Sequence, residues 1–413
     1  MRKWGREVLG GIRDPYYRGA LILFVFGPML FLIQPLVIGA VSDAYELTHR
    51  QIGWFASSDL YGSALAAFVA GFWITRVSPL IPIVGGLICF ILGNLITLGS
   101  PSFDALLLVR MFCGAGAGTV VSVATVILGR HQSPAFVFGV GIAGRSFVST
   151  IALFALPTPI ASFGFQAAYW FLIGVAVIAF VFGSAIRSWG LDVSATQEES
   201  ARRDDRQNFE GANNRRGALL SIFGLLSSLF LLTAVAAVWA YSQPIAKESG
   251  IDLEFVGFAA GLAGVSAVLA SLVASVTGRK GTLRLQLVAS ITILLGATAC
   301  LQPGVSPLLF AVAIFIFKGA YCFVIALQMA IVAFVDRSGR FLAVLPSFQI
   351  LGSAIGPSLV ALAMTAGDLS MVTVIAGSML AATLLSILLP ARVTDTGGRL
   401  ASRAALGAGG AGT

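Results

Sequence analysis

Residues 106–118 read LLLVRMFCGAGAG and place a single arginine, Arg110, among apolar and small side chains. The nearest polar residues along the chain are Asp104 on one side and Thr119 on the other. A basic residue beside several glycines is compatible with a phosphate-binding loop, and it is also compatible with an arginine inside a membrane helix. The composition of the whole chain decides between these two interpretations.

That composition indicates a membrane protein. Of the 413 residues, 57% are hydrophobic and only 11% are charged, whereas soluble domains carry about 25% charged residues. The net charge of +8 would suit a nucleic-acid-binding protein, but in a membrane protein basic cytoplasmic loops account for it. We therefore expect membrane lipids, and no nucleic acid, as partners of this chain.

Twelve apolar stretches are long enough to cross the ~30 Å hydrocarbon core of a bilayer, which predicts an all-α membrane protein. They divide the chain into an N-terminal six-helix bundle (1–186), a charged linker (187–216), a C-terminal six-helix bundle (217–391) and a Gly/Ala-rich tail (392–413) that we expect to be disordered. The stretches are 19–41, 51–75, 80–100, 104–128, 134–157, 165–186, 217–243, 254–277, 285–303, 307–335, 340–366 and 369–391.

The basic residues outside these stretches predict the orientation of the chain. Nearly all of them lie on the side of the two termini and the linker, and the opposite side carries only Arg50 and Lys247. Cytoplasmic loops of membrane proteins are enriched in Lys and Arg. We therefore expect both termini and the linker to be cytoplasmic, and the short loops fit a bacterial inner membrane.

The two bundles share residues at nearly constant separation. Gln34 and Gln243, each followed by proline, are 209 residues apart, and Gly114 and Gly319 are 205 residues apart. A duplicated unit of six helices is common in secondary transporters. The pattern therefore predicts two homologous bundles.

With these features the chain resembles the major facilitator superfamily of transporters. In the family's fourth helix a leucine and an arginine precede glycine-x-glycine, and Leu106, Arg110, Gly114 and Gly116 match them, with Cys113 where glutamine is frequent. The resemblance implies a fold of twelve helices in two bundles. It also implies transport by alternating access, with no cofactor and no enzymatic activity.

Two other family motifs are incomplete in this sequence. The loop after the second stretch keeps the basic Arg76 but lacks the acidic residue before it. The resemblance therefore implies a gating role for Arg76 in a reduced latch. The glycine–proline motif of antiporters is absent from the fifth stretch, which favours uptake by symport over drug export.

Two basic residues lie deep inside apolar stretches. At ~1.5 Å per residue, Arg145 lies roughly 16 Å from one end of the fifth stretch, and Lys318 lies roughly 16 Å from the opposite end of the tenth. Both are then near the midplane, where repeat-built transporters bind substrates and where an ionised side chain is costly. We interpret them as a clamp on an anionic group, first of all a carboxylate. The alternative is that each has a buried partner in its own bundle.

The duplication gives Arg110 a different interpretation. It aligns Lys318 with Cys113 and Phe315 with Arg110, so Arg110 has no basic counterpart in the second bundle. We expect it to pair with Asp59 of the second stretch. Protonation of Asp59 would break that pair and couple transport to protons, and a static structural ion pair is the alternative.

Uncharged polar and aromatic side chains complete the predicted substrate site. The candidates are Gln34, Trp239, Tyr241, Gln243, Tyr321, Gln328 and Gln349. Glycines spaced by four residues predict close helix contacts. These pairs are Gly114 and Gly118, Gly257 and Gly261, and Gly352 and Gly356.

The remaining motifs argue against other classes of protein. No P-loop or dinucleotide fingerprint is present, and the four cysteines have no metal or disulfide spacing. His49 and His131 lie in opposite loops, so we expect no metal site. The sequence thus predicts a monomeric secondary active transporter for a small organic anion, coupled to protons in symport. Proton-coupled export of drugs or metabolites is the first alternative, and a non-transporting receptor or a membrane enzyme is the second.

Overall fold

The computed structural model describes residues 15–74, 77–99, 102–129, 134–183, 211–277, 282–336, 340–364 and 368–409. Within these ranges the regular secondary structure is entirely helical. Seven helices are long and apolar enough to cross a membrane alone, and a bent pair makes an eighth. When the shorter and broken helices are joined along the chain, the described helices are consistent with the twelve predicted spans.

The N-terminal bundle contains two broken spans. The first consists of α2 (Pro15–Phe26), α3 (Met29–Leu32) and α4 (Gln34–Tyr45), and the fifth consists of α8 (Pro134–Ala155) and α9 (Pro157–Phe163), which are bent by 45°. The other four spans are α5 (His49–Trp73), α6 (Leu80–Leu98), α7 (Phe103–Gly129) and α10 (Gln166–Gly183).

Proline explains why the first span breaks. Pro28 lies at the junction of α2 and α3, and Pro35 lies in the first turn of α4. Each removes one backbone donor and its ring clashes with the preceding turn. In the second bundle the corresponding helix contains only Pro244 and stays continuous.

The C-terminal bundle contains six unbroken helices. They are α12 (Gly211–Glu248), α13 (Leu253–Thr277), α14 (Leu283–Ala299), α15 (Pro307–Val335), α16 (Arg340–Ala363) and α17 (Ser370–Gly409).

Two predicted boundaries are wrong. The linker was expected to reach residue 216, but α12 begins at Gly211, and the tail from 392 was expected to be disordered, but α17 continues to Gly409. A helix already formed by a packed span extends at little cost through residues of high helix propensity, and this tail contains several alanines, leucines and arginines. The part of the predicted linker before residue 211 lies outside the described residues.

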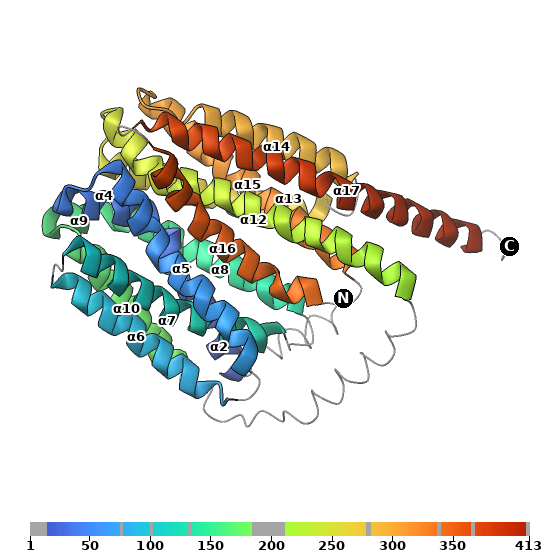
Figure 1. Ribbon diagram of the computed structural model, residues 1–413, viewed down its shortest axis with the longest axis horizontal. Coiled ribbons are helices and arrows are strands. Elements are labelled where there is room, and N and C mark those ends of the chain that lie inside the picture. Colours follow the sequence, from blue (N-terminus) through green and yellow to red (C-terminus); the bar gives the residue numbers. More distant parts are fainter. Residues whose placement is uncertain are drawn as a thin grey trace.

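The two bundles meet at one end of the molecule. We call this the closed end; it contains α4, α9 and the first residues of α5 and α13. The linker end contains the last residues of α10 and the first of α12. Figure 1 shows the blue-to-green bundle and the yellow-to-red bundle touching near α4 and diverging toward the linker end. Contacts between the bundles join α5 to α16, α8 to α13, and α4 to both α12 and α13.

Glycines of the opening stretch allow α7 to lie against α5. A Cβ on Gly114 would collide with the backbone of Asp59, and one on Gly118 would lie 2.5 Å from the carbonyl oxygen of Ser63. On another face of α7, Gly116 has the backbone of Gly86 in α6 as its neighbour. The prediction that this stretch is a helix-contact surface is confirmed.

The other two glycine pairs also form helix contacts. Gly352 and Gly356 of α16 lie directly against the backbone of α12, and Gly257 and Gly261 of α13 lie against α8. The first pair packs within the C-terminal bundle and the second joins the two bundles. Small residues therefore make the closest contacts inside each bundle and between them, as expected where lipid gives helices no hydrophobic drive to associate.

We predict that Gly114→Ala destabilises the protein, because the new methyl group forces α7 away from the backbone of α5. Overpacking of this kind costs about 1–3 kcal/mol, which corresponds to a fall in Tm of about 2–10 °C for a bundle of this size. Thermal unfolding in detergent measures the change. Gly174→Ala is the matched control, because nothing lies within 4 Å of a Cβ at that site in α10. Equal Tm values for the two variants would contradict the packing argument.

Candidate functional site

Arg110 is fully buried, and each of its three nitrogens has a partner. Its Nε donates to Asp59 Oδ2 at 2.9 Å and its Nη2 donates to Asp59 Oδ1 at 2.7 Å. Its Nη1 donates to Asn94 Oδ1 at 2.9 Å. The arginine and the carboxylate thus form a bidentate, charge-assisted pair, which is the strongest arrangement for these two groups. The structure brings Asp59 and Arg110 together, and a role in proton coupling stays a prediction.

The arginine side of this ion pair is shielded from solvent. The guanidinium carbon lies 5.2 Å from the centre of the Tyr169 ring of α10. The Arg110 side chain has no exposed area, whereas the Asp59 side chain is 11% exposed. Any exchange of protons with water must therefore occur at the carboxylate.

Sequence reasoning missed Asn94 and Tyr169. Asn94 could have been identified from the sequence, because it is the only amide side chain in the apolar helix α6. Tyr169 stands beside Trp170 near a helix end, where aromatic residues usually mark the membrane interface. Because Tyr169 resembles an interface residue of this kind, its contact with Arg110 was not predicted.

Lys318 of α15 lies in an aromatic environment. Its Nζ lies 3.9 Å from the ring centre of Trp239 and 5.3 Å from that of Tyr321. The residue is only 8% exposed. Among the described residues, no carboxylate lies within salt-bridge distance of its ammonium group. Cation–π contacts stabilise such a group by about 2 kcal/mol, but they leave its charge without a counter-ion.

Arg145 of α8 has a similar environment in the other bundle. Its guanidinium carbon lies 5.3 Å from the ring centre of Phe24, and none of the carboxylates in the described segments forms a salt bridge with it. Arg145 and Lys318 lie within electrostatic range of each other. The structure therefore brings together two cations that come from opposite bundles.

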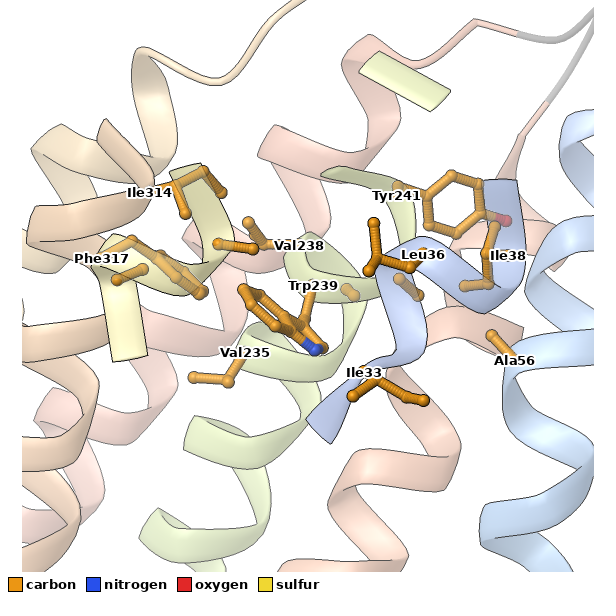
Figure 2. Close-up of a cluster of buried hydrophobic side chains, with 14 of the residues drawn as sticks. Ile33, Leu36, Ile38, Ala56, Val235, Val238, Trp239, Tyr241, Ile314 and Phe317 are labelled. Atoms are coloured by element: carbon orange, nitrogen blue, oxygen red, sulfur yellow. The ribbon is translucent and has the colours of Figure 1, made fainter. Parts of the chain in front are cut away.

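Trp239 contacts both Lys318 and the first span of the N-terminal bundle. Its ring is fully buried, and its Nε1 donates a 3.1 Å hydrogen bond to the carbonyl oxygen of Phe31. Figure 2 shows the indole between Phe317 on one side and Ile33 and Leu36 on the other, with its nitrogen toward the segment that carries Ile33. The residue thus contacts both bundles.

The other predicted substrate residues are spread over several places. Tyr241 donates its hydroxyl to the carbonyl of His49 at 2.8 Å, and Gln243 lines a cavity at the closed end. Gln34 donates to the carbonyl of Ala56 at 3.0 Å. Gln349 has a buried amide nitrogen with no hydrogen-bond partner among the described residues. Their roles in binding stay predictions.

One further predicted substrate residue makes its hydrogen bonds within the C-terminal bundle. Gln328 is fully buried inside the C-terminal bundle, where its amide bonds Ser227 at 2.7 Å and Ser228 at 3.2 Å. Arg76 and His131 lie outside the described residues.

The closed end holds a cavity of about 250 Å³ between the bundles. It is lined by Ser42, Leu47, His49, Ile52, Gln243, Pro244, Lys247 and Glu248. Two polar side-chain contacts cross the interface there, the ion pair of Lys247 with Asp43 and a 3.4 Å contact of His49 Nε2 with Glu248 Oε1. Ion pairs as exposed as the first contribute less than ~1 kcal/mol, so the packing of the helices contributes most of the closure.

Several curated proteins are similar to this chain over part of its length. The galactose–proton symporter of Escherichia coli (strain K12) is 23% identical over 138 residues, 33% of this chain and 30% of the symporter. A Bacillus subtilis (strain 168) protein named for niacin and nicotinamide transport is 27% identical over 152 residues, 35% of this chain and 37% of that protein. The chain thus spans less than half the length of these relatives.

The fold extends the similarity to nearly the whole chain. A crystal structure of the D-xylose–proton symporter matches with a TM-score of 0.69 and 13% identity, over 91% of this chain and 97% of the symporter. An inward-facing bacterial homologue of the lysosomal transporter Spinster matches with a TM-score of 0.60 and 14% identity, over 94% and 97% of the two chains.

A family model covers the segment that holds the Asp59–Arg110 pair, the two cations and the break in the first span. The model, described as Major Facilitator Superfamily, matches residues 19–335. This is most of the chain, and it agrees with the two bundles of six helices. The chain belongs to the major facilitator superfamily, a family of transporters and not of enzymes, and it is an integral membrane protein.

Proposed function

We propose that this transporter moves a small organic anion, with a carboxylate group, by proton-coupled symport. The observation that carries the proposal is the environment of Lys318. It is a buried ammonium beside aromatic rings, and no carboxylate of the described residues lies within salt-bridge distance of it. A cation at membrane depth is costly. A substrate carboxylate would supply the counter-charge that the protein itself does not provide.

Arg145 strengthens the case for an anion. It adds a second positive charge from the opposite bundle, and its charge repels that of Lys318. An anion between the two would replace this repulsion by two attractions and would draw the side chains of Arg145 and Lys318 together. The relative named for niacin and nicotinamide transport is compatible with this substrate class, because niacin is an aromatic carboxylate.

Asp59 is the proton-coupling residue in this proposal. Its carboxylate neutralises Arg110 and is the only member of the pair with exposed area. Proton binding to Asp59 would remove the negative charge and leave Arg110 uncompensated between α5, α6 and α7. The packing of these helices would then have to change, which is how a proton can bias a conformational equilibrium.

Alternating access requires two conformations, and this one is closed at the end that holds α4 and α9. We assign the linker end to the cytoplasm of a bacterial inner membrane, because the basic residues gather there, and we propose that the protein works as a monomer. In this orientation the present conformation faces inward, and opening of the closed end admits substrate from outside.

We predict that Lys318→Met weakens carboxylate transport, because methionine keeps the length of the side chain without its charge. Charge-assisted hydrogen bonds contribute about 1.5–3 kcal/mol, so the apparent affinity should fall about 10- to 100-fold. A thermal-shift screen with nicotinate, benzoate, lactate and their neutral amides selects the substrate. Uptake of the labelled acid into proteoliposomes then gives KM and rate.

Lys318→Arg is the matched control for this experiment, because it keeps the positive charge and should retain most of the uptake. Arg145→Met should weaken binding in the same direction as Lys318→Met. Unchanged KM and rate in Lys318→Met, or equal thermal shifts with acids and amides, would exclude the anion clamp.

We predict that Asp59→Asn uncouples transport from protons. Uptake driven by an inward proton gradient should be lost, while exchange of labelled for unlabelled substrate across the same liposomes should persist. Breaking a buried ion pair costs about 3–5 kcal/mol, so the variant should also have a lower Tm. The double variant Asp59→Asn with Arg110→Gln removes both charges and should recover part of that Tm without recovering the proton-driven uptake. Gradient-driven uptake at the normal rate in Asp59→Asn would assign the pair a purely structural role.

A further inference from the structure

The break in the first span leaves the backbone carbonyl of Phe31 without its α-helical donor. In an α-helix each carbonyl accepts from the N–H four residues later. The residue four positions after Phe31 is Pro35, which has no N–H. Within its own span the Phe31 carbonyl faces only the N–H of Ile33, two residues later, which is shared with the Met29 carbonyl. A donor from another helix can therefore complete its hydrogen bonding, because lipid supplies none inside a packed protein.

Trp239 of the opposite bundle supplies that donor. Its Nε1 lies 3.1 Å from the Phe31 oxygen, and the residue is 1% exposed. An indole has a single N–H and no acceptor, so this bond uses the whole hydrogen-bonding capacity of the side chain. The hydrogen bond is buried and joins the two bundles, unlike the exposed Lys247–Asp43 ion pair at the closed end.

The face of the same ring holds the Lys318 ammonium at 3.9 Å. A cation above an aromatic face polarises the ring, and neighbouring polar interactions strengthen one another in a low dielectric. The charge of Lys318 therefore makes the indole N–H a better donor to Phe31. Neutralisation of that charge weakens the bond between the bundles.

We propose that Trp239 is a positioning residue that couples the state of Lys318 to the opening of the closed end. While the charge of Lys318 has no counter-ion, the hydrogen bond from the indole to Phe31 keeps the broken first span against α12. When an anion neutralises Lys318, this hold weakens and the closed end opens more readily. The step involving the anion rests on the proposed function, whereas the hold of Trp239 on Phe31 does not.

Hydrogen exchange of the full-length protein in lipid nanodiscs tests this hold without any substrate. Peptides that cover residues 34–45 of α4 and 253–264 of α13 report opening of the closed end. We expect Trp239→Phe to accelerate their exchange about fivefold, because phenylalanine keeps an aromatic face for Lys318 but has no N–H. Fivefold corresponds to ~1 kcal/mol at 1.4 kcal/mol per factor of ten, the usual contribution of one hydrogen bond.

Trp170→Phe is the matched control, because Trp170 lies in α10 of the N-terminal bundle with 58% of its surface exposed. Its exchange should equal that of the wild type. If Trp239→Phe also exchanges like the wild type, the inference is wrong. The anion clamp is tested separately, by measuring substrate uptake of the Lys318→Met variant.

Pro35→Ala identifies the carbonyl as the reason for the effect. Alanine restores an N–H four residues after Phe31, so the carbonyl gains a donor within its own helix. The effect of Trp239→Phe should then fall from about fivefold to less than twofold in the Pro35→Ala background. An undiminished effect would mean that Trp239 acts through packing and would overturn the inference.

Lys318→Met tests the link to the cation. Loss of the charge should accelerate exchange of the same peptides about twofold in the wild type and leave it unchanged in the Trp239→Phe background. Equal acceleration in both backgrounds would show that Lys318 acts independently of the indole. Trp239 would then not couple Lys318 to the opening of the closed end.

Discussion

A bilayer offers no hydrogen-bond partners, and this constraint explains most of the specific features of the protein. Every backbone group within a span must be satisfied inside the protein, which is why the regular secondary structure of the described residues is entirely helical. Where a proline interrupts a helix, as Pro35 does, the carbonyl that loses its donor must find another. Where a charge is buried, it needs a counter-charge, which Asp59 supplies for Arg110. The fold and the functional site follow from the same requirement.

Many features of the fold could be predicted because each depends on residues close together in the sequence. Span length and hydropathy indicate twelve helices, and glycines spaced by four indicate contact faces, which α7 and α16 confirm. The tail was predicted wrongly because its composition is typical of disorder, whereas its helix continues α17 beyond the span. A neighbouring helix already in place was not visible in the composition of the tail itself.

The site was harder to predict, because its contacts depend on which helices are neighbours. Asp59 and Arg110 could be matched by sign and depth, since each has few possible partners in an apolar environment. Asn94 and Tyr169 could not, because their contribution depends on α6 and α10 lying against α7. Tyr241 was expected near the substrate, and its hydroxyl instead bonds the backbone of His49 in the opposite bundle. A polar side chain in a membrane helix indicates that a partner exists, but it does not identify that partner.

The two bundles have similar folds but treat their buried charges differently. The N-terminal bundle neutralises Arg110 with its own carboxylate and surrounds the pair with Asn94 and Tyr169. The C-terminal bundle leaves Lys318 on aromatic rings, which accept a cation without cancelling its charge. A neutral pair stabilises one arrangement of its helices until a proton disturbs it, whereas an uncompensated cation attracts an anion from outside. Under the proposed function the N-terminal bundle carries the proton-sensitive pair together with Arg145, one half of the anion clamp, and the C-terminal bundle carries the other half, Lys318. The interface between the bundles is where the response to protons and the response to substrate must meet.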